Sequence, residues 1–361
     1  MFQHFIITPF SFRSKYHTKK RGQDPLKCKN LIHRFKMFET ACLPSVLSQQ
    51  NKDFTWVFII DPALPERFFN NLKKLTSPCR DVQFYVVNSD TNFQGTNWLK
   101  PYIHPGTQYV ITSELDDDDA IFSGFTHYLN EHLRELHKSG KLPVIKFFGC
   151  KSAVLWDFFH TKNAPYGFKK PYPDYFKMPV SVGHSVCCKY PELDLTIRRF
   201  PHIHFDHLAM TDMELQALDN KIAQMNLTRR NLIREMAKES LLNWDGELSK
   251  DVNFHNINTP NAQAVLINHF DNIQYFRIFT NSKFRESVRD ENTFPGITID
   301  LTHATEYIRQ HKRSFSVLFK AIKNALFYNN LELRGTGVKN VLKDKIKRIL
   351  NVVIGVYEMP K

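Results

Sequence analysis

The feature that most restricts the fold is FTWVFIID, residues 54–61, an almost uninterrupted apolar run that ends at Asp61-Pro62. A strand with one face in water alternates apolar and polar residues, whereas a strand covered on both faces does not. Strands of the second kind occur mainly in parallel sheets that have helices on each side. This segment therefore predicts an α/β protein.

Short strand-like segments alternate with segments of helical periodicity along the first 150 residues. The expected strands are residues 4–8, 54–61, 82–87, 108–112 and 143–148. The expected helices are residues 31–43, which Pro44 ends or kinks, residues 64–75, and a helix from Ile121 that Ser139-Gly140 stops. This alternation predicts a mainly parallel sheet flanked by helices, with ligands bound outside the carboxyl ends of the strands.

The periodicity is weaker beyond residue 150. Residues 208–243 are typical of a polar helix, and AVLINHF at residues 264–270 is typical of a strand. The last part of the chain is basic and partly helical. We therefore expect one α/β domain over residues 1–280 and a basic, helical C-terminal extension over residues 281–361.

Composition limits the partners and the compartment. The chain has 361 residues and a formal net charge of +13, which favours anionic partners such as nucleotides, nucleic acid or an acidic membrane surface. Its six cysteines form no CxxC pair, which is typical of reduced, intracellular thiols. The N-terminal segment shows no signal-peptide pattern, and no apolar run reaches the roughly 18 residues that a membrane span needs. We expect a cytoplasmic protein.

Negative charge gathers at one point, in the sequence YVITSELDDDDAIF that begins at Tyr109. Asp116–Asp119 follow an expected strand and precede the helix expected from Ile121. One or two of them could cap that helix, at about 0.5–2 kcal/mol for a cap, but four exceed this need. Mg²⁺ and Mn²⁺ prefer carboxylate oxygens, and carboxylates at alternate positions can converge on one ion together with substrate phosphates. The cluster predicts a divalent cation site, with helix capping as the alternative.

These residues also resemble a known family. LDDDDAI resembles the DxD motif of glycosyltransferases with the GT-A fold. FKMFETACLPSVLSQQNKDFTWVFIID, residues 35–61, resembles the helix and strand of bacterial rhamnosyltransferase-like and related family-two-like enzymes, and VLINHFDN, residues 265–272, resembles their late histidine element. The resemblance extends over about residues 1–275. It implies a GT-A, Rossmann-like domain over residues 1–280.

The activity implied by the resemblance is metal-dependent transfer of a hexosyl group, rhamnosyl in the family's name, in polysaccharide biosynthesis. The donor would be a nucleotide-diphosphate sugar, and the acceptor a hydroxyl of a glycan or of a lipid-linked glycan. The cofactor would be Mn²⁺ or Mg²⁺, which would hold the diphosphate and stabilise it as the leaving group.

The resemblance also implies roles for individual residues. Asp116 and Asp118 would be the DxD pair, with Asp119 in support, and the alternative register pairs Asp117 with Asp119. His269 would be a further metal ligand. The residues expected at the nucleotide-sugar are Thr8, Asp61, Asp116 and Asp117.

The chain departs from the family pattern at two places. The family's first strand often continues as Thr-Arg-Phe, whereas this chain has Thr8-Pro9-Phe10, so Arg13 or Arg34 would face the phosphates instead. No Glu-Asp pair is evident as the catalytic base that an inverting enzyme needs. Asp206 is the expected base, with Asp174 as its competitor.

Other functions stay open at this point. The basic segment from Lys339 alternates Lys and Arg with apolar residues, which predicts either a peripheral contact with an anionic membrane at its inner face or a helix packed on the domain. A non-catalytic polyanion- or nucleic-acid-binding protein is one alternative function, but the basic residues are spread along the chain, so we expect no nucleic acid as partner. Another metal-dependent phosphoryl or nucleotidyl transferase is the second alternative, although no Gly-rich phosphate loop is present.

Overall fold

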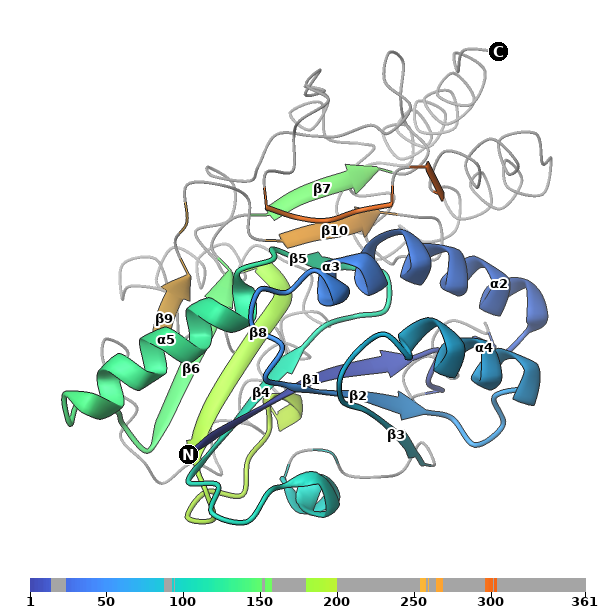
Figure 1. Ribbon diagram of the computed structural model, residues 1–361. Helices are drawn as coiled ribbons and strands as arrows, with labels where there is room; N and C mark the ends of the chain where they lie inside the picture. The colour runs from blue at the N-terminus through green and yellow to red at the C-terminus, as the bar shows by residue number, and fades with distance from the viewer. Residues whose placement is uncertain are drawn as a thin grey trace, which may run out of the picture.

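The computed structural model describes residues 1–13, 24–87, 93, 95–150, 153–157, 180–199, 254–257, 259, 264–268, 296–300 and 302–303. A large central sheet runs through this described part of the chain (Figure 1). Its strands are β1 (Phe2–Phe10), β2 (Thr55–Ile60), β3 (Val82–Val86), β4 (Tyr109–Glu114), β6 (Ile145–Cys150), β8 (Val180–Lys189) and β9 (Phe254–Ile257). Their order in the sheet is β3-β2-β1-β4-β8-β6-β9.

The sheet is mainly parallel. Neighbouring strands pair in parallel everywhere except at β8, which is antiparallel to both β4 and β6. The apolar run at residues 54–61 forms β2, and every residue of that strand is buried. The predicted α/β fold with a mainly parallel sheet is therefore confirmed.

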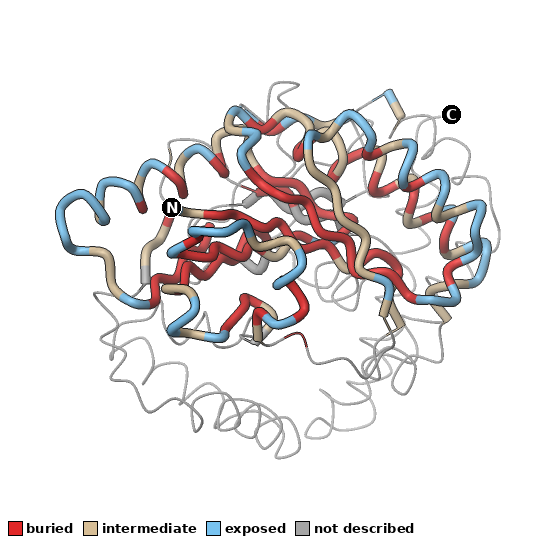
Figure 2. Tube along the Cα trace, turned by 60° about the horizontal axis from the view of Figure 1, so that its bottom comes forward, coloured by how far each residue is buried: buried red, intermediate tan, exposed pale blue. Residues whose placement is uncertain are grey.

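Successive residues of β2 face two different cores. Trp56 and Phe58 belong to the core under the helices, whereas Val57 and Ile59 belong to a core with Trp98 of the short helix η2 (Asn97–Tyr102). The helices over the first core are α2 (Cys28–Met37), α3 (Leu43–Leu47), α4 (Glu66–Thr76) and α5 (Phe125–Lys138). Figure 2 shows the strands buried at the centre and exposed residues along α2, α4 and α5.

The first predicted helix is longer and less regular than expected. Instead of ending at Leu43, α2 continues into the π-helix η1 (Phe38–Cys42), and α3 begins directly at Leu43. Pro44 lies in the first turn of α3, and because proline has no N–H it cannot donate a hydrogen bond to the preceding turn. The helix nevertheless does not end at Leu43: it passes through the π-turn, where the Leu43 N–H bonds to the Phe38 carbonyl, into α3.

The helix expected from Ile121 begins later, at Phe125. Ala120–Ile121 form the short strand β5, which pairs antiparallel with β10 (Ala264–Asn268), and β10 pairs in parallel with β7 (Ala153–Asp157). The N-cap of α5 is Gly124, and its first turn contains no acidic residue. The alternative that the aspartates cap this helix is therefore wrong.

The strand expected within residues 264–270 is confirmed as β10. The helix expected over residues 208–243, the boundary between residues 280 and 281, and the basic segment from Lys339 lie outside the described residues, as does most of the expected C-terminal extension. Within the described ranges, no helix has both the length and the apolar character that crossing a membrane requires. The six cysteines, all of them described, are free thiols.

Candidate active site

Three strand ends bring the candidate site together. β1 lies between β2 and β4 and is parallel to both, so the carboxyl ends of these strands share one edge of the sheet. In open α/β sheets this is the edge at which ligands bind. The residues that leave the sheet there are Ser11–Arg13, Asp61 and Asp116–Asp119.

Three of the four aspartates converge. One carboxylate oxygen from each of Asp116, Asp118 and Asp119 lies within 4.8 Å of the other two. Asp116 is exposed, whereas the other two are each only 8% exposed, so the group opens to solvent on one side. Three carboxylate oxygens at this spacing suit a hard divalent cation. They are also the residues that sequence analysis expects at the metal, while Asp117 does not join the group.

Asp117 points into the protein instead. It is fully buried, and Arg34 of α2 forms an ion pair with its carboxylate. Burial, together with the carboxylates of Asp118 and Asp116, raises the pKa of Asp117 to about 7 against the opposing effect of Arg34. Arg34 Nη1 also donates a hydrogen bond of 2.9 Å to Asp118 Oδ2. One guanidinium therefore joins a buried carboxylate to a carboxylate of the converging group.

The chain turns sharply where β1 ends. Ser11 has a φ of 49°, in the left-handed region that non-glycine residues seldom adopt. Its backbone N–H lies close enough to Asp117 to lower the pKa of that carboxyl. Its hydroxyl is buried and makes no hydrogen bond. Because buried hydroxyls usually have a partner, this one marks a position that a bound polar group would satisfy.

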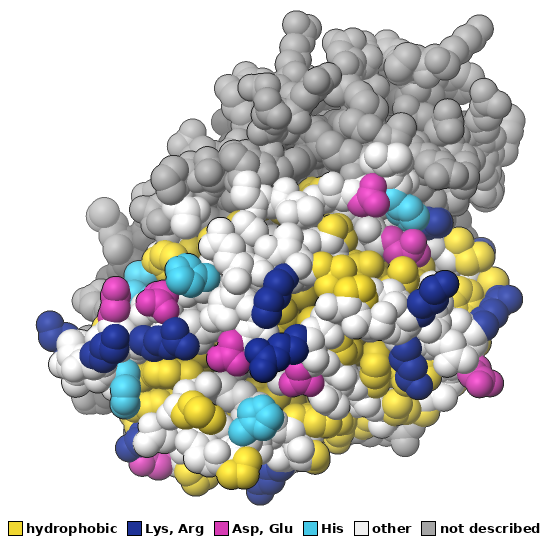
Figure 3. Space-filling model, in the orientation of Figure 1, with side chains coloured by type: hydrophobic (Ala, Val, Ile, Leu, Met, Phe, Trp, Pro, Cys, Tyr) yellow, Lys and Arg dark blue, Asp and Glu magenta, His cyan; other side chains and the backbone are white. Residues whose placement is uncertain are grey.

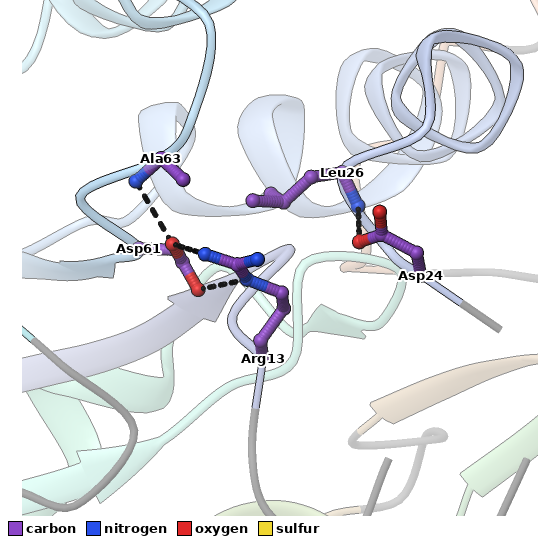
Figure 4. Close-up of polar contacts among 5 residues, drawn as sticks. All are labelled: Arg13, Asp24, Leu26, Asp61 and Ala63. Atoms are coloured by element: carbon purple, nitrogen blue, oxygen red, sulfur yellow. Dashed lines mark hydrogen bonds and ion pairs between the residues drawn. The ribbon is translucent and has the colours of Figure 1, made fainter. Parts of the chain in front are cut away.

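Asp61 and Arg13 form a second ion pair at the same edge (Figure 4). Asp61 accepts two hydrogen bonds of 2.8 Å, from Nε and Nη2 of Arg13, and a third of 2.9 Å from the Ala63 N–H. Burial alone would raise the pKa of Asp61, but Arg13 and the Ala63 N–H outweigh it and lower the pKa. Asp61 is therefore held as a carboxylate, while the Arg13 side chain remains 37% exposed.

The π-helix η1 packs against the acidic group. Its last residue, Cys42, is buried, and burial together with the four nearby aspartates raises the pKa of its thiol well above the usual value. Thr40, in the same turn, accepts a hydrogen bond of 2.8 Å from the Asp300 N–H, while its hydroxyl is buried without a partner. Single π-turns within helices are frequent at functional sites.

Of the remaining predicted site residues, the structure describes Thr8. Thr8 lies within β1, fully buried, and its hydroxyl accepts a hydrogen bond of 3.0 Å from the Trp56 indole N–H. Its contact with a nucleotide stays a prediction. The expected metal ligand His269, the expected base Asp206 and its competitor Asp174 lie outside the described residues.

Sequence analysis did not single out three residues that surround the aspartates, namely Ser11, Thr40 and Cys42. A serine carries no sequence signal for a left-handed φ, because its side chain permits the ordinary regions equally well. Cys42 falls on the apolar face of the first helix, a position that indicates core packing. The fold brings Ser11, at the end of β1, and Cys42, at the end of η1, to the acidic group.

Residues 14–147 of the chain match the model of the family described as "Putative rhamnosyl transferase". This segment contains Arg34, Asp61 and all four aspartates. The match confirms the glycosyltransferase resemblance over this part of the chain, and with it the expectation of an enzyme of this class. Among curated proteins, none matches this sequence.

Several solved glycosyltransferase structures are similar to the chain at low identity. TarS residues 1–349 from S. aureus are 11% identical, over 98% of this chain and 81% of that one, with a TM-score of 0.32. The same protein in complex with UDP-GlcNAc is 10% identical, over 99% and 82% of the two chains, with a TM-score of 0.31. Mouse xyloside xylosyltransferase 1 is 10% identical, over 72% and 86%, with a TM-score of 0.26. Structural similarity at this level is too low to assign a function.

Proposed function

We propose that this protein is a metal-dependent glycosyltransferase. It moves a sugar, rhamnose or another hexose, from a nucleotide-diphosphate sugar to a hydroxyl of a glycan or lipid-linked acceptor. The observation that carries this proposal is the convergence of Asp116, Asp118 and Asp119 at the carboxyl edge of a parallel sheet. These aspartates lie inside the segment that matches the family.

The proposed cofactor is Mn²⁺ or Mg²⁺. The three carboxylates offer the oxygen ligands that hard cations prefer, and the exposed side of the group leaves room for substrate phosphates. The Ser11 backbone N–H lies at Asp117, and the buried hydroxyl of the same residue has no hydrogen-bond partner, which supports a site built for a bound polar group. When bound, the ion supplies positive charge that stabilises the departing diphosphate.

The two arginines would have different tasks. Arg34 is engaged by Asp117 and Asp118, whereas Arg13 pairs with Asp61 and keeps an exposed side. A guanidinium binds phosphate oxygens through two parallel hydrogen bonds. We therefore place Arg13 at the donor phosphates, with Asp61 holding it and facing the nucleoside.

The acceptor side of the reaction remains a proposal from sequence. Asp206 would take the proton of the acceptor hydroxyl as that oxygen attacks the anomeric carbon, with Asp174 as the competing base. The basic segment from Lys339 would bring the protein to an anionic membrane surface if the acceptor is lipid-linked.

The test combines nucleotide binding with a double substitution. Thermal unfolding is measured with UDP, GDP and dTDP, each with and without Mn²⁺. One nucleotide should stabilise the protein only when Mn²⁺ is present, by about 2.7 kcal/mol at 100 times its dissociation constant. Asp116→Ala with Asp118→Ala should abolish this stabilisation and the Mn²⁺-dependent turnover of the matching donor. The control, Asp53→Ala with Glu131→Ala, removes two exposed carboxylates and should change neither.

Two other outcomes would favour the alternatives. Transfer of a phosphoryl or nucleotidyl group in place of a sugar would make the protein a different transferase that uses the same carboxylates. Polyanion binding with a steep salt dependence and no nucleotide affinity would favour a non-catalytic binding protein. The face in Figure 3 speaks against the second outcome, because Lys and Arg are interspersed there with Asp and Glu.

A further inference from the structure

We propose that Arg34 is a positioning residue for the metal ligand Asp118. Anchored by the buried Asp117, Arg34 holds the Asp118 carboxylate in the orientation in which one of its oxygens meets those of Asp116 and Asp119. This inference rests on the proposed function, because it concerns the same acidic group. It adds a residue from another element to the machinery that binds the metal.

Arg34 projects from helix α2, which is packed into the core. Its neighbours on α2, Leu31 and Phe35, are buried in the core, and the Phe35 ring packs edge-on against Phe10 at 4.8 Å between centroids. Phe10 directly precedes Ser11, where the chain turns toward the aspartates. Side chains that project from packed helices hold a ligand more accurately than side chains on loops.

Asp117 anchors the guanidinium group of Arg34. A fully buried carboxylate needs a charged partner, and Arg34 is the ion-pair partner that the structure gives it. The planar guanidinium fork forms ion pairs with Asp117 through one nitrogen and with Asp118 through another. A lysine ammonium keeps the charge but lacks this fork, so it cannot hold two carboxylates in the same relative geometry.

Substitution of Arg34 has opposite effects on metal affinity, depending on whether Arg34 competes with the metal or positions its ligand. If Arg34 were only a counterion that competes with the metal for Asp118, removing its charge would strengthen metal binding. If it positions Asp118, removing its fork weakens metal binding whether or not the charge remains. Groups that orient metal ligands typically contribute a factor of about 10–100 in metal affinity.

The experiment measures Mn²⁺ binding to the full chain without nucleotide, from the electron paramagnetic resonance signal of free Mn²⁺. Arg34→Lys should raise the Mn²⁺ dissociation constant about 10–100-fold. Arg134→Lys is the matched control, because Arg134 makes an exposed 2.9 Å ion pair with Glu131 on α5, and it should leave the constant unchanged. Thermal unfolding of each variant shows whether it is folded.

A double-mutant cycle separates positioning from general stability. In an Asp118→Asn background, Arg34→Lys should have no further effect on Mn²⁺ binding, because the ligand through which Arg34 acts is gone. A residue that merely supports the fold would weaken binding equally in both backgrounds. If Arg34→Lys does not fold, Asp117→Asn replaces it: this variant keeps Arg34 but removes its anchor, and it should weaken Mn²⁺ binding in the same way.

Three results would overturn the inference: an unchanged Mn²⁺ affinity in Arg34→Lys, tighter binding in Arg34→Gln, or an equal loss in both backgrounds of the cycle. Each of these leaves the proposed function intact as long as the wild-type protein binds Mn²⁺. If the wild-type protein binds neither Mn²⁺ nor Mg²⁺, the metal dependence of the proposed function fails, and the role of Arg34 fails with it.

Discussion

In the candidate site, two arginines each form an ion pair with an aspartate. Arg13 and Asp61 form an open pair at the ends of β1 and β2, with the arginine partly exposed. Arg34 and Asp117 form the second pair, in which the carboxylate is fully buried and the arginine side chain is 26% exposed. Because the carboxylate is buried in both pairs, each aspartate depends on its arginine. Arg34 also holds Asp118, whereas Arg13 is the arginine that we propose meets the donor phosphates.

The left-handed backbone at Ser11 leads to a prediction about stability. Ser11→Val should lower the free energy of unfolding by about 1–3 kcal/mol relative to Ser11→Gly, because a β-branched residue tolerates a positive φ poorly and glycine tolerates it well. Urea denaturation of both variants measures the difference. The same pair of substitutions at the exposed Ser77, where φ is −55°, should not favour glycine. Equal stability of the two Ser11 variants would contradict the strained conformation.

At the scale of secondary-structure elements, α5 is joined to the edge strand β9 by aromatic and polar contacts. Tyr128 and His132 lie on α5, and His255 lies on β9. The Tyr128 hydroxyl is hydrogen-bonded to His255 Nε2 at 2.7 Å, and the rings of His132 and His255 stack with centroids 4.1 Å apart. Stacked imidazoles in a half-buried contact are expected to disfavour protonation, which makes this contact sensitive to pH.

The free energy of unfolding should depend on the protonation of His255 between about pH 4 and pH 6.5. Burial, together with the nearby His132 and Lys146, lowers the pKa of His255 to about 4. In the unfolded chain this histidine binds a proton near pH 6.5. Between about pH 6.5 and about pH 4 the unfolded state therefore binds more protons than the folded state. The free energy of unfolding consequently falls as the pH falls through this range. His255→Asn should reduce this fall in urea unfolding measured across the range. His127→Asn, exposed on the same helix, should leave it unchanged, and an identical pH dependence in both variants would contradict the prediction.

At the scale of the whole molecule, we expect the order of the strands to determine which part of the sheet resists local unfolding most. β2 lies between β3 and β1 and is entirely buried, whereas β3 is at the edge of the sheet and none of its residues is fully buried. The site grows from the ends of the inner strands β1, β2 and β4. Its residues therefore rest on the part of the sheet that opens least.

Amide hydrogen exchange under native conditions tests this arrangement. The amides of β2 should open with a free energy close to that of global unfolding, whereas those of β3 should exchange through smaller local openings, because edge strands fray. Mass spectrometry of peptides from the two strands measures the difference. Equal protection of β2 and β3 would mean that the described part of the sheet unfolds as one unit.

The sequence by itself predicted those features whose pattern lies within a single strand or helix. The apolar run at residues 54–61 predicted a strand buried on both faces, and β2 is such a strand. The resemblance of the four aspartates and of the segment before them to a known family predicted a glycosyltransferase, in agreement with the family match. The strand could be predicted because burial periodicity is a property of neighbouring residues, and the resemblance could be seen because its motifs are short and contiguous.

The tertiary structure decided what depends on distant pairing. β10 pairs with β5, and this contact makes Ala120–Ile121 a strand and delays the helix to Phe125. Helix α2 carries Arg34 to Asp117 and Asp118, which leaves three aspartates, rather than four, converging with one another. No local pattern contains this information, because the energy of an ion pair or a strand contact depends on residues that the chain brings together only when it folds.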